Sequence, residues 1–260
     1  MKSARIGDAW LHVEADLSPA GRNVVYVNSL GSDLRIWDEV AASLKAAGFG
    51  ALRYDLRGHG LSDLGTAPKL IADHVADLAG VIEAFGVGQA AICGVSVGGV
   101  IALGLAEAHP EKIEKLVLSN TGAKIGTPET WNPRIAAVEN GGVAAVAEGV
   151  LERWFPAALR EAGDSRVALA RNMLTRTPAA GYVATCVALR DSDLTQAARG
   201  VKVPALCVAG GLDGSTPPTL VRSLAALVPG AEYFEIEGAG HLPCLQTPRE
   251  LAGRLLAFLK

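Results

Sequence analysis

The stretch Q-A-A-I-C-G-V-S-V-G-G-V-I-A-L-G-L-A-E-A, residues 89–108, decides the fold of this chain. Its apolar start, residues 90–93, has the length and character of a buried strand, and a turn of small residues follows it. A helix-like stretch then runs to His109, where Pro110 ends it. The sequence therefore predicts a strand, a sharp turn and a helix, with Ser96 at the apex of the turn.

Glycines stand two residues before and two residues after this serine. In such a G-x-S-x-G turn the serine adopts a strained backbone conformation that lifts its hydroxyl clear of the sheet. Gly94 and Gly98 leave room, because a side chain at either position would collide with the neighbouring strand or helix. A turn that merely packs tightly is the alternative, and a phosphate loop is disfavoured because neither phosphate-binding glycine motif is present. We interpret Ser96 as a nucleophile.

The composition limits the class of protein. The chain has 260 residues, 50% hydrophobic and 20% charged, with a net charge of −3, so we expect one domain with an insertion. This charge gives no basic face for nucleic acid and no polybasic membrane anchor. No charged leader precedes an apolar segment, and the longest apolar run, residues 95–106, is too short to span a bilayer. We therefore expect a cytoplasmic protein.

The four cysteines are far apart in the chain. They are Cys93, Cys186, Cys207 and Cys244, and two of them lie in strand-like apolar runs. This spacing favours buried, reduced thiols over a disulfide framework or a zinc site.

Strand-like and helix-like stretches alternate in both halves of the chain. Strands are expected at residues 9–15, 24–28, 50–54, 90–93, 113–120, 203–210 and 232–236, and helices at 37–47, 71–85, 217–228 and 249–259. Because most of these strands are apolar on both faces, they predict an α/β fold with a mostly parallel sheet covered by helices on both sides.

The alternation stops between Gly122 and Gly200. Residues 127–140, 142–154, 165–177 and 181–190 have helical patterns with no strand between them, and Thr127 and Pro128 are a typical helix start. We expect residues 1–121 and 201–260 to form the core, with residues 122–200 inserted as a helical cap over the active face.

A serine hydroxyl needs a base to remove its proton, and the base needs an acid to fix its tautomer. His241 follows the last expected strand in a glycine-rich loop, and Asp213 follows the strand at 203–210. The chain order Ser96, Asp213, His241 is the order of triads built on such a serine turn. Asp191 and Asp193, at the end of the insertion, are alternative acids.

Five motifs carry a family resemblance. They are N-S-L-G-S-D (28–33), L-R-Y-D-L-R-G-H-G-L-S-D (52–63), C-G-V-S-V-G-G (93–99), W-N-P-R (131–134) and G-A-G-H (238–241). With these motifs the chain resembles the α/β-hydrolases along its whole length and, among them, the 3-oxoadipate enol-lactonases. The serine and histidine motifs are common to the superfamily, whereas N-S-L-G and W-N-P-R narrow the resemblance to the enol-lactonases. Many members carry His-Gly where this chain has Asn28-Ser29, and methionine is more usual than Val97.

The resemblance implies the α/β-hydrolase fold and a site without metal or organic cofactor. It implies that the backbone N–H groups of Leu30 and Val97 form an oxyanion hole. It also implies hydrolysis of a small carboxylated enol-lactone, 3-oxoadipate enol-lactone, to 3-oxoadipate. Trp131 and Arg134 share a helix face, and if that face looks into the pocket Arg134 binds the substrate carboxylate. A solvated Arg134 beside a core tryptophan is the alternative.

The D-L-R-G-H-G stretch offers a second acid–base pair, Asp55 and His59. Because this stretch recurs in hydrolases of varied chemistry, we interpret it as a turn whose charged groups satisfy buried backbone. The remaining histidines, His12, His74 and His109, are assigned to packing or to the surface.

Two other functions fit the same motifs. A carboxylesterase, C–C bond hydrolase or perhydrolase would share the triad, and a ligand sensor could keep the pocket and hydrolyse slowly. Dehalogenases and epoxide hydrolases are disfavoured, because they need a carboxylate where Ser96 stands. The expected partner is a small lactone or ester with a carboxylate, with no nucleic acid and no membrane. A homo-oligomer is left open.

Overall fold

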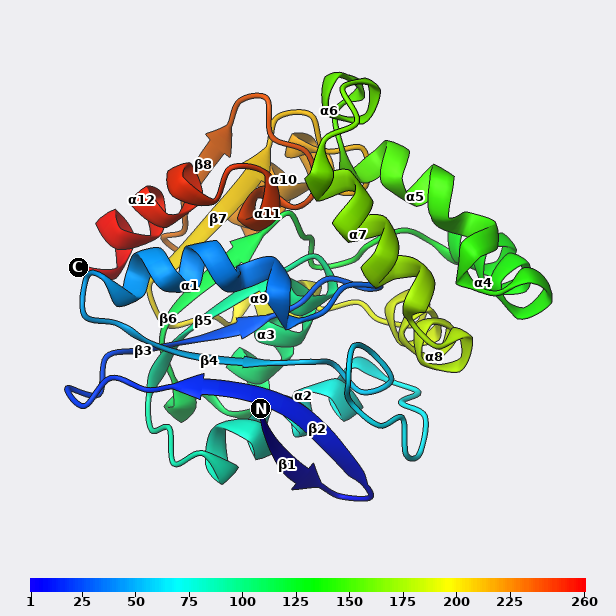
Figure 1. The fold of residues 1–260 in the computed structure, drawn as a ribbon. Coiled ribbons are helices and arrows are strands. Elements are labelled where there is room, and N and C mark those ends of the chain that lie inside the picture. The colour runs from blue at the N-terminus through cyan, green and yellow to red at the C-terminus, as the bar shows by residue number, and fades with distance from the viewer.

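The structure, a computed structural model, describes residues 1–260 and is built on an eight-stranded sheet (Figure 1). The strands lie in the order β1-β2-β4-β3-β5-β6-β7-β8. They are β1 (Lys2–Ile6), β2 (Ala9–Asp16), β3 (Asn23–Val27), β4 (Gly50–Tyr54), β5 (Ala90–Val95), β6 (Ile113–Ser119), β7 (Ala205–Gly210) and β8 (Glu232–Ile236). Strand β2 pairs antiparallel with β1 and β4, and every other neighbouring pair is parallel.

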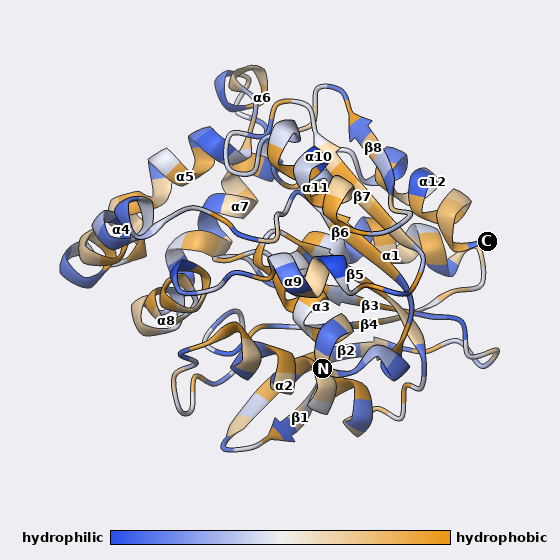
Figure 2. Ribbon diagram, turned by 180° about the vertical axis from the view of Figure 1, so that it is seen from behind, coloured by the Kyte–Doolittle hydropathy of each residue, from blue (hydrophilic) through white to orange (hydrophobic).

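The central strands are buried on both faces, which explains their unbroken apolar runs. Every residue of β3, β5 and β7 is buried, and Figure 2 shows the hydrophobic colour along β6 and β7. Strand β2, beside the edge, instead alternates buried and partly exposed residues over its first part. This difference is the expected one between a covered parallel sheet and a half-solvated antiparallel pair.

Helices cover both faces of the sheet (Figures 1 and 2). On one face α1 (Asp38–Lys45) packs against α11 (Pro243–Gln246) and α12 (Pro248–Leu259). On the other face lie α2 (Ile71–Ala84), α3 (Val97–Ala108), α9 (Thr195–Arg199) and α10 (Pro218–Leu227). The predicted α/β architecture, with a mostly parallel sheet between two helical layers, is confirmed.

Between β6 and β7 the chain forms only helices. They are α4 (Pro128–Gly141), the 3₁₀ turn η3 (Val143–Val146), α5 (Ala147–Trp154), α6 (Ala157–Glu161), α7 (Ser165–Arg176), α8 (Ala179–Arg190) and α9. We call residues 122–200 the helical insertion; α4, α5, α7 and α8 gather at one side of the sheet in Figure 1. Thr127 is the N-cap of α4, as predicted, and its N–H donates to the Thr130 hydroxyl at 2.9 Å.

The structure also contains elements that the patterns do not predict. Strand β1 has only five residues, two of them charged, and α6 and α9 also have five residues each, too few to establish a period. The helix expected from Trp37 is preceded by η1 (Leu34–Trp37), whose N-cap Asp33 accepts the Arg35 N–H, and η2 (Pro110–Lys112) precedes β6. All four cysteines are buried and free, as expected. None of the helices is both long and apolar enough to cross a membrane.

Candidate active site

Ser96 lies in the sharp turn between β5 and α3. Its φ of 58° and ψ of −121° are a conformation that few residues other than glycine adopt. A Cβ on Gly94 would lie 2.2 Å from the carbonyl oxygen of Gly98, and a Cβ on Gly98 would lie 2.2 Å from that of Val27. The Thr121 hydroxyl donates to the Ser96 carbonyl at 2.7 Å. The structure confirms that the turn is strained and that only glycine fits on either side.

Asp213 and His241 follow the carboxyl ends of β7 and β8. Nδ1 of His241 lies 2.8 Å from Oδ2 of Asp213, and both side chains are almost fully buried. The structure therefore pairs the two side chains that the sequence assigns as base and acid. Parallel strands bring them to the same sheet edge as Ser96, although the chain separates these residues widely.

Two residues that the motifs do not indicate hold Asp213 in place. Asn120 donates to Oδ2 at 2.9 Å, and the Thr216 hydroxyl donates to the same oxygen at 2.7 Å. The N–H groups of Ser215 and Thr216 donate to Oδ1. The order Asp-Gly-Ser-Thr is typical of an aspartate-centred turn and could have indicated Thr216. Asn120 gives no local signal, because it reaches Asp213 from the end of β6.

These contacts decide the charge of Asp213. Burial raises the pKa of its carboxyl, but the charge of His241 and the hydrogen bonds from His241, Asn120 and Thr216 outweigh burial, and the pKa lies below its ordinary value. Asp213 is therefore ionised at neutral pH. A carboxylate in this position holds a proton on Nδ1 of His241 and leaves Nε2 free to accept one.

The end of α5 fixes the loop that carries His241. The carbonyl of Trp154 accepts the His241 N–H at 2.9 Å, and the indole stacks on the imidazole with ring centroids 6.2 Å apart. Gln246 donates to the same carbonyl and accepts the Gly240 N–H. A residue of the helical insertion thus helps to fix the position of the imidazole.

Ser96 and His241 line one cavity of about 620 Å³, together with Leu30, Trp131 and Arg134. This volume suits a small organic molecule. The structure contains no hydrogen bond between the Ser96 hydroxyl and the His241 ring; such bonds are often long until substrate binds.

The two predicted oxyanion donors lie beside this cavity. Leu30 lines it, and its N–H donates no hydrogen bond within the protein. Val97 is the first residue of α3, so its N–H has no partner inside the helix. Both N–H groups are therefore available to a ligand.

Arg134 turns into the cavity rather than into solvent. Its guanidinium lies 5.3 Å from the ring centroid of Trp131 and 5.4 Å from that of Tyr182, and it donates to the Tyr182 hydroxyl. The Trp131 indole is itself anchored on the Ile125 carbonyl at 2.7 Å. The partners of Arg134 are thus a hydroxyl and two rings, and none of them is a carboxylate.

The alternative acids lie elsewhere. Asp191 pairs with Arg190 through both oxygens, and Asp193 faces Lys124 at 3.5 Å, all on the surface of the insertion. Neither contacts His241, so the structure gives Asp213 no competitor.

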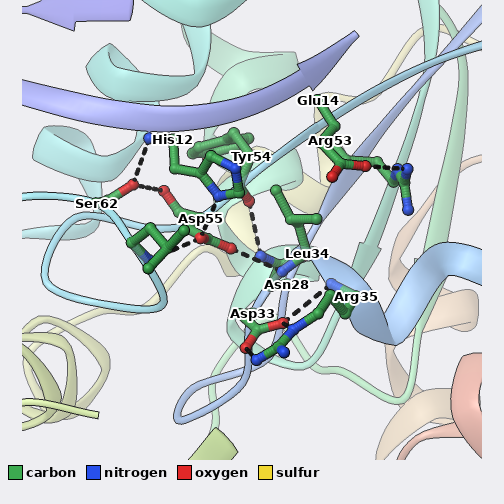
Figure 3. A network of polar contacts seen from close by, with 11 residues as sticks. His12, Glu14, Asn28, Asp33, Leu34, Arg35, Arg53, Tyr54, Asp55 and Ser62 are labelled. Carbon is green, nitrogen blue, oxygen red and sulfur yellow. Dashed lines mark hydrogen bonds and ion pairs between the residues drawn. The ribbon is translucent and has the colours of Figure 1, made fainter. Parts of the chain in front are cut away.

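Asp55 and His59 are not an acid–base pair. Asp55 accepts from Nδ1 of His12 at 2.8 Å, a contact drawn in Figure 3, and it also accepts the backbone N–H groups of Leu34 and Leu61. His59 instead directs Nδ1 to the Arg57 carbonyl at 3.1 Å. Asp55 satisfies buried backbone, which confirms the interpretation of this turn as scaffold.

The model of the α/β-hydrolase fold family matches residues 22–248, most of the chain. The chain belongs to the α/β-hydrolase family. This α/β-hydrolase is 30% identical over 239 residues to 3-oxoadipate enol-lactonase 1 of Acinetobacter baylyi, covering 91% of this chain and 88% of the relative. It is 29% identical to the pimeloyl-[acyl-carrier protein] methyl ester esterase of Chromobacterium violaceum, covering 92% of this chain and 95% of the esterase.

Solved structures agree with these relatives. The enol-lactonase of Burkholderia xenovorans LB400 superposes on this α/β-hydrolase with a TM-score of 0.94 at 35% identity, and 99% of each chain is covered. A hydrolase of Pseudomonas aeruginosa PA01 gives the same TM-score at 33% identity, covering 99% of this chain and 97% of that one. The predicted resemblance to the enol-lactonases is confirmed.

Proposed function

We propose that this α/β-hydrolase opens a small carboxylated enol-lactone, 3-oxoadipate enol-lactone, to 3-oxoadipate by means of a Ser96–His241–Asp213 triad. The observation that carries the proposal is the position of Arg134 in the same cavity as Ser96 and His241. A cation there favours an ester with a distal carboxylate over a neutral one. The similarity to the enol-lactonases of A. baylyi and B. xenovorans supports the same substrate class.

In the first half of the reaction Oγ of Ser96 attacks the lactone carbonyl carbon. Nε2 of His241 takes the hydroxyl proton, and the Asp213 carboxylate stabilises the imidazolium that forms. The carbonyl oxygen becomes negative and accepts the N–H groups of Leu30 and Val97; losing one such donor typically costs about 3 kcal/mol in the transition state. The bond to the ring oxygen then breaks, and the enolate takes the proton that His241 received from Ser96 and becomes a ketone that stays attached to the acyl group; His241 is neutral again.

In the second half water hydrolyses the ester bond between the acyl group and Ser96. His241 takes a proton from the water molecule, whose oxygen attacks the acyl carbon, and the Ser96 oxygen leaves with the proton from His241. The product carries two carboxylates, one formed at Ser96 and one present from the start. This sequence of steps calls for no metal and no organic cofactor.

The substitution Arg134→Ala tests the proposal on two substrates. Removing a cation from a carboxylate in a mostly dry pocket costs about 2–4 kcal/mol, so kcat/KM for the enol-lactone should fall roughly 30- to 1000-fold. An aryl acetate has no carboxylate to lose and should be affected far less. Arg176→Ala, on α7 and outside this cavity, is the matched control, with melting temperatures to detect damage.

Equal losses on both substrates would make Arg134 a structural residue. No loss on either substrate would remove the carboxylate contact from the proposal.

A simple ester hydrolase is the second candidate, favoured by the likeness to the C. violaceum esterase. It would turn over the aryl acetate faster than the enol-lactone. A slowly hydrolysing sensor would turn over neither substrate at the rate of about 1 per second or more that is typical of enzymes.

A further inference from the structure

The cavity contains a second arginine that no sequence motif indicates. Arg153 lies in the last turn of α5 and lines the same cavity as Ser96 and Arg134. Burial and nearby charges act on its guanidinium, but the guanidinium makes no hydrogen bond within the protein. Other arginines of the molecule, such as Arg57 and Arg166, are held by carboxylates at 2.6 Å.

The charges around Arg153 do not cancel. Burial lowers the pKa of its guanidinium, and the charge of Arg134 lowers it further, while Tyr182 and Glu152 oppose the shift. Arg134 has no carboxylate either, and its buried Nε has no hydrogen-bond partner. Two cations thus share a cavity and repel each other, and a bound anion would stabilise both.

The backbone of Arg153 is fixed to the loops of the triad. Its carbonyl accepts the N–H of Gly214, directly after Asp213, at 3.0 Å, and the next carbonyl, of Trp154, accepts the His241 N–H. Arg134 comes from another helix, α4, and lies against the rings of Trp131 and Tyr182. The two guanidinium groups therefore approach the cavity from different helices of the insertion.

We infer that Arg153 and Arg134 together bind one carboxylate of the ligand, which makes Arg153 a further specificity-determining residue. A carboxylate can accept from two guanidinium groups at once, since its two oxygens offer about four lone-pair positions. The inference deepens the proposed function and rests on it for the identity of the substrate, but not for the class of anion. The ligands it favours have one carboxylate between the arginines and an acyl or second carboxyl group at Ser96, as in short linear dicarboxylates.

Adipate is a suitable probe, because its binding needs no turnover. We expect calorimetry on the Ser96→Ala protein to show adipate binding at millimolar concentration or below. Adding Arg153→Ala should raise the Kd at least tenfold, Arg134→Ala should do the same, and Arg153→Lys should give an intermediate Kd because it keeps a cation. Arg176→Ala should leave the Kd unchanged, and dimethyl adipate, which lacks the charges, should bind no better to Ser96→Ala than to the Arg153→Ala variant.

The otherwise wild-type enzyme gives an independent readout. Arg153→Ala should raise KM for the enol-lactone at least tenfold with a smaller effect on kcat, because the contact is made before and during the reaction. A melting temperature near that of the wild type shows that the variant is folded, and Arg153→Lys should restore part of the KM.

The outcomes distinguish the two-arginine site from the proposed hydrolysis of the enol-lactone. Adipate binding that is absent, or that survives Arg153→Ala, overturns the two-arginine site even if the protein hydrolyses the enol-lactone. Adipate binding that needs both arginines, in a protein that does not turn over the enol-lactone, leaves the anion site standing and removes the proposed function.

Discussion

The backbone at Ser96 is held in a conformation that it would not adopt alone. Such a conformation costs about 1–3 kcal/mol, and it persists because the surroundings leave no other. Gly94 and Gly98 allow close contact with neighbouring backbone, and Thr121 ties down the Ser96 carbonyl. These contacts place the hydroxyl at the wall of the cavity, where it makes no hydrogen bond within the protein.

Ser96→Ala should abolish hydrolysis and leave the melting temperature close to that of the wild type, because the hydroxyl makes no hydrogen bond within the protein. In the wild type, when deacylation is slowed, peptide mass spectrometry should find the acyl adduct on Ser96. An adduct on any other residue would remove Ser96 from the role of nucleophile.

Asp213→Asn should preserve the fold and lower kcat by roughly 10⁴-fold, because the amide favours the wrong tautomer of His241. The matched control is Asp191→Asn, which changes a carboxylate of the surface pair with Arg190 and should alter kcat by no more than a few fold. Steady-state kinetics of both variants tests whether Asp213 is the acid of the triad. A loss in kcat below tenfold for Asp213→Asn would mean that another residue has that role.

At the scale of elements, α8 joins the helical insertion to the core. A Cβ on Gly181 would lie 2.3 Å from the Gly58 carbonyl oxygen, so the helix rests directly on the turn that carries His59. His74, on α2, approaches the Thr185 hydroxyl of α8 at 3.4 Å, and both histidines are buried. We propose that residues 122–200 act as a cap domain and that this contact is one of those that fix it on the core.

Acid should weaken that contact. Burial lowers the pKa of His59 to about 4 and that of His74 to about 3, both from 6.5, and the charge of His59 adds to the effect on His74. The unfolded chain therefore takes up protons below about pH 6.5 that the folded protein does not. The stabilisation is complete above that pH and is lost as the pH falls towards 4, by up to about 2 kcal/mol per histidine at pH 5.

Urea unfolding at neutral and acid pH measures this loss. His74→Gln should show a smaller fall in unfolding free energy than the wild type, whereas His109→Gln, at a half-exposed site, should fall as the wild type does. Identical pH dependence of the wild type and His74→Gln would show that His74 does not contribute.

At the scale of the whole molecule, the sequence predicts what short-range patterns encode. The buried strands, the Ser96 turn and the helices of the insertion follow from local hydrophobic order and glycine spacing. Asn120 and Arg153 do not, because Asn120 contacts a residue 93 positions further along the chain and Arg153 reaches Arg134 only through the cavity that α4 and α5 both line. Strand order is likewise a long-range property, and β1 is too short and polar to be seen in advance.

The central claim is that this molecule is a serine hydrolase for a carboxylated enol-lactone. The most direct test is steady-state turnover of 3-oxoadipate enol-lactone by the purified protein beside an aryl acetate, with Ser96→Ala as the blank. We expect a kcat of about 1–1000 per second on the enol-lactone. Its kcat/KM should exceed that of the aryl acetate by roughly 30-fold or more, as a cation in the pocket would give. Turnover of the enol-lactone no faster than that of Ser96→Ala, or a preference for the aryl acetate, would contradict the claim.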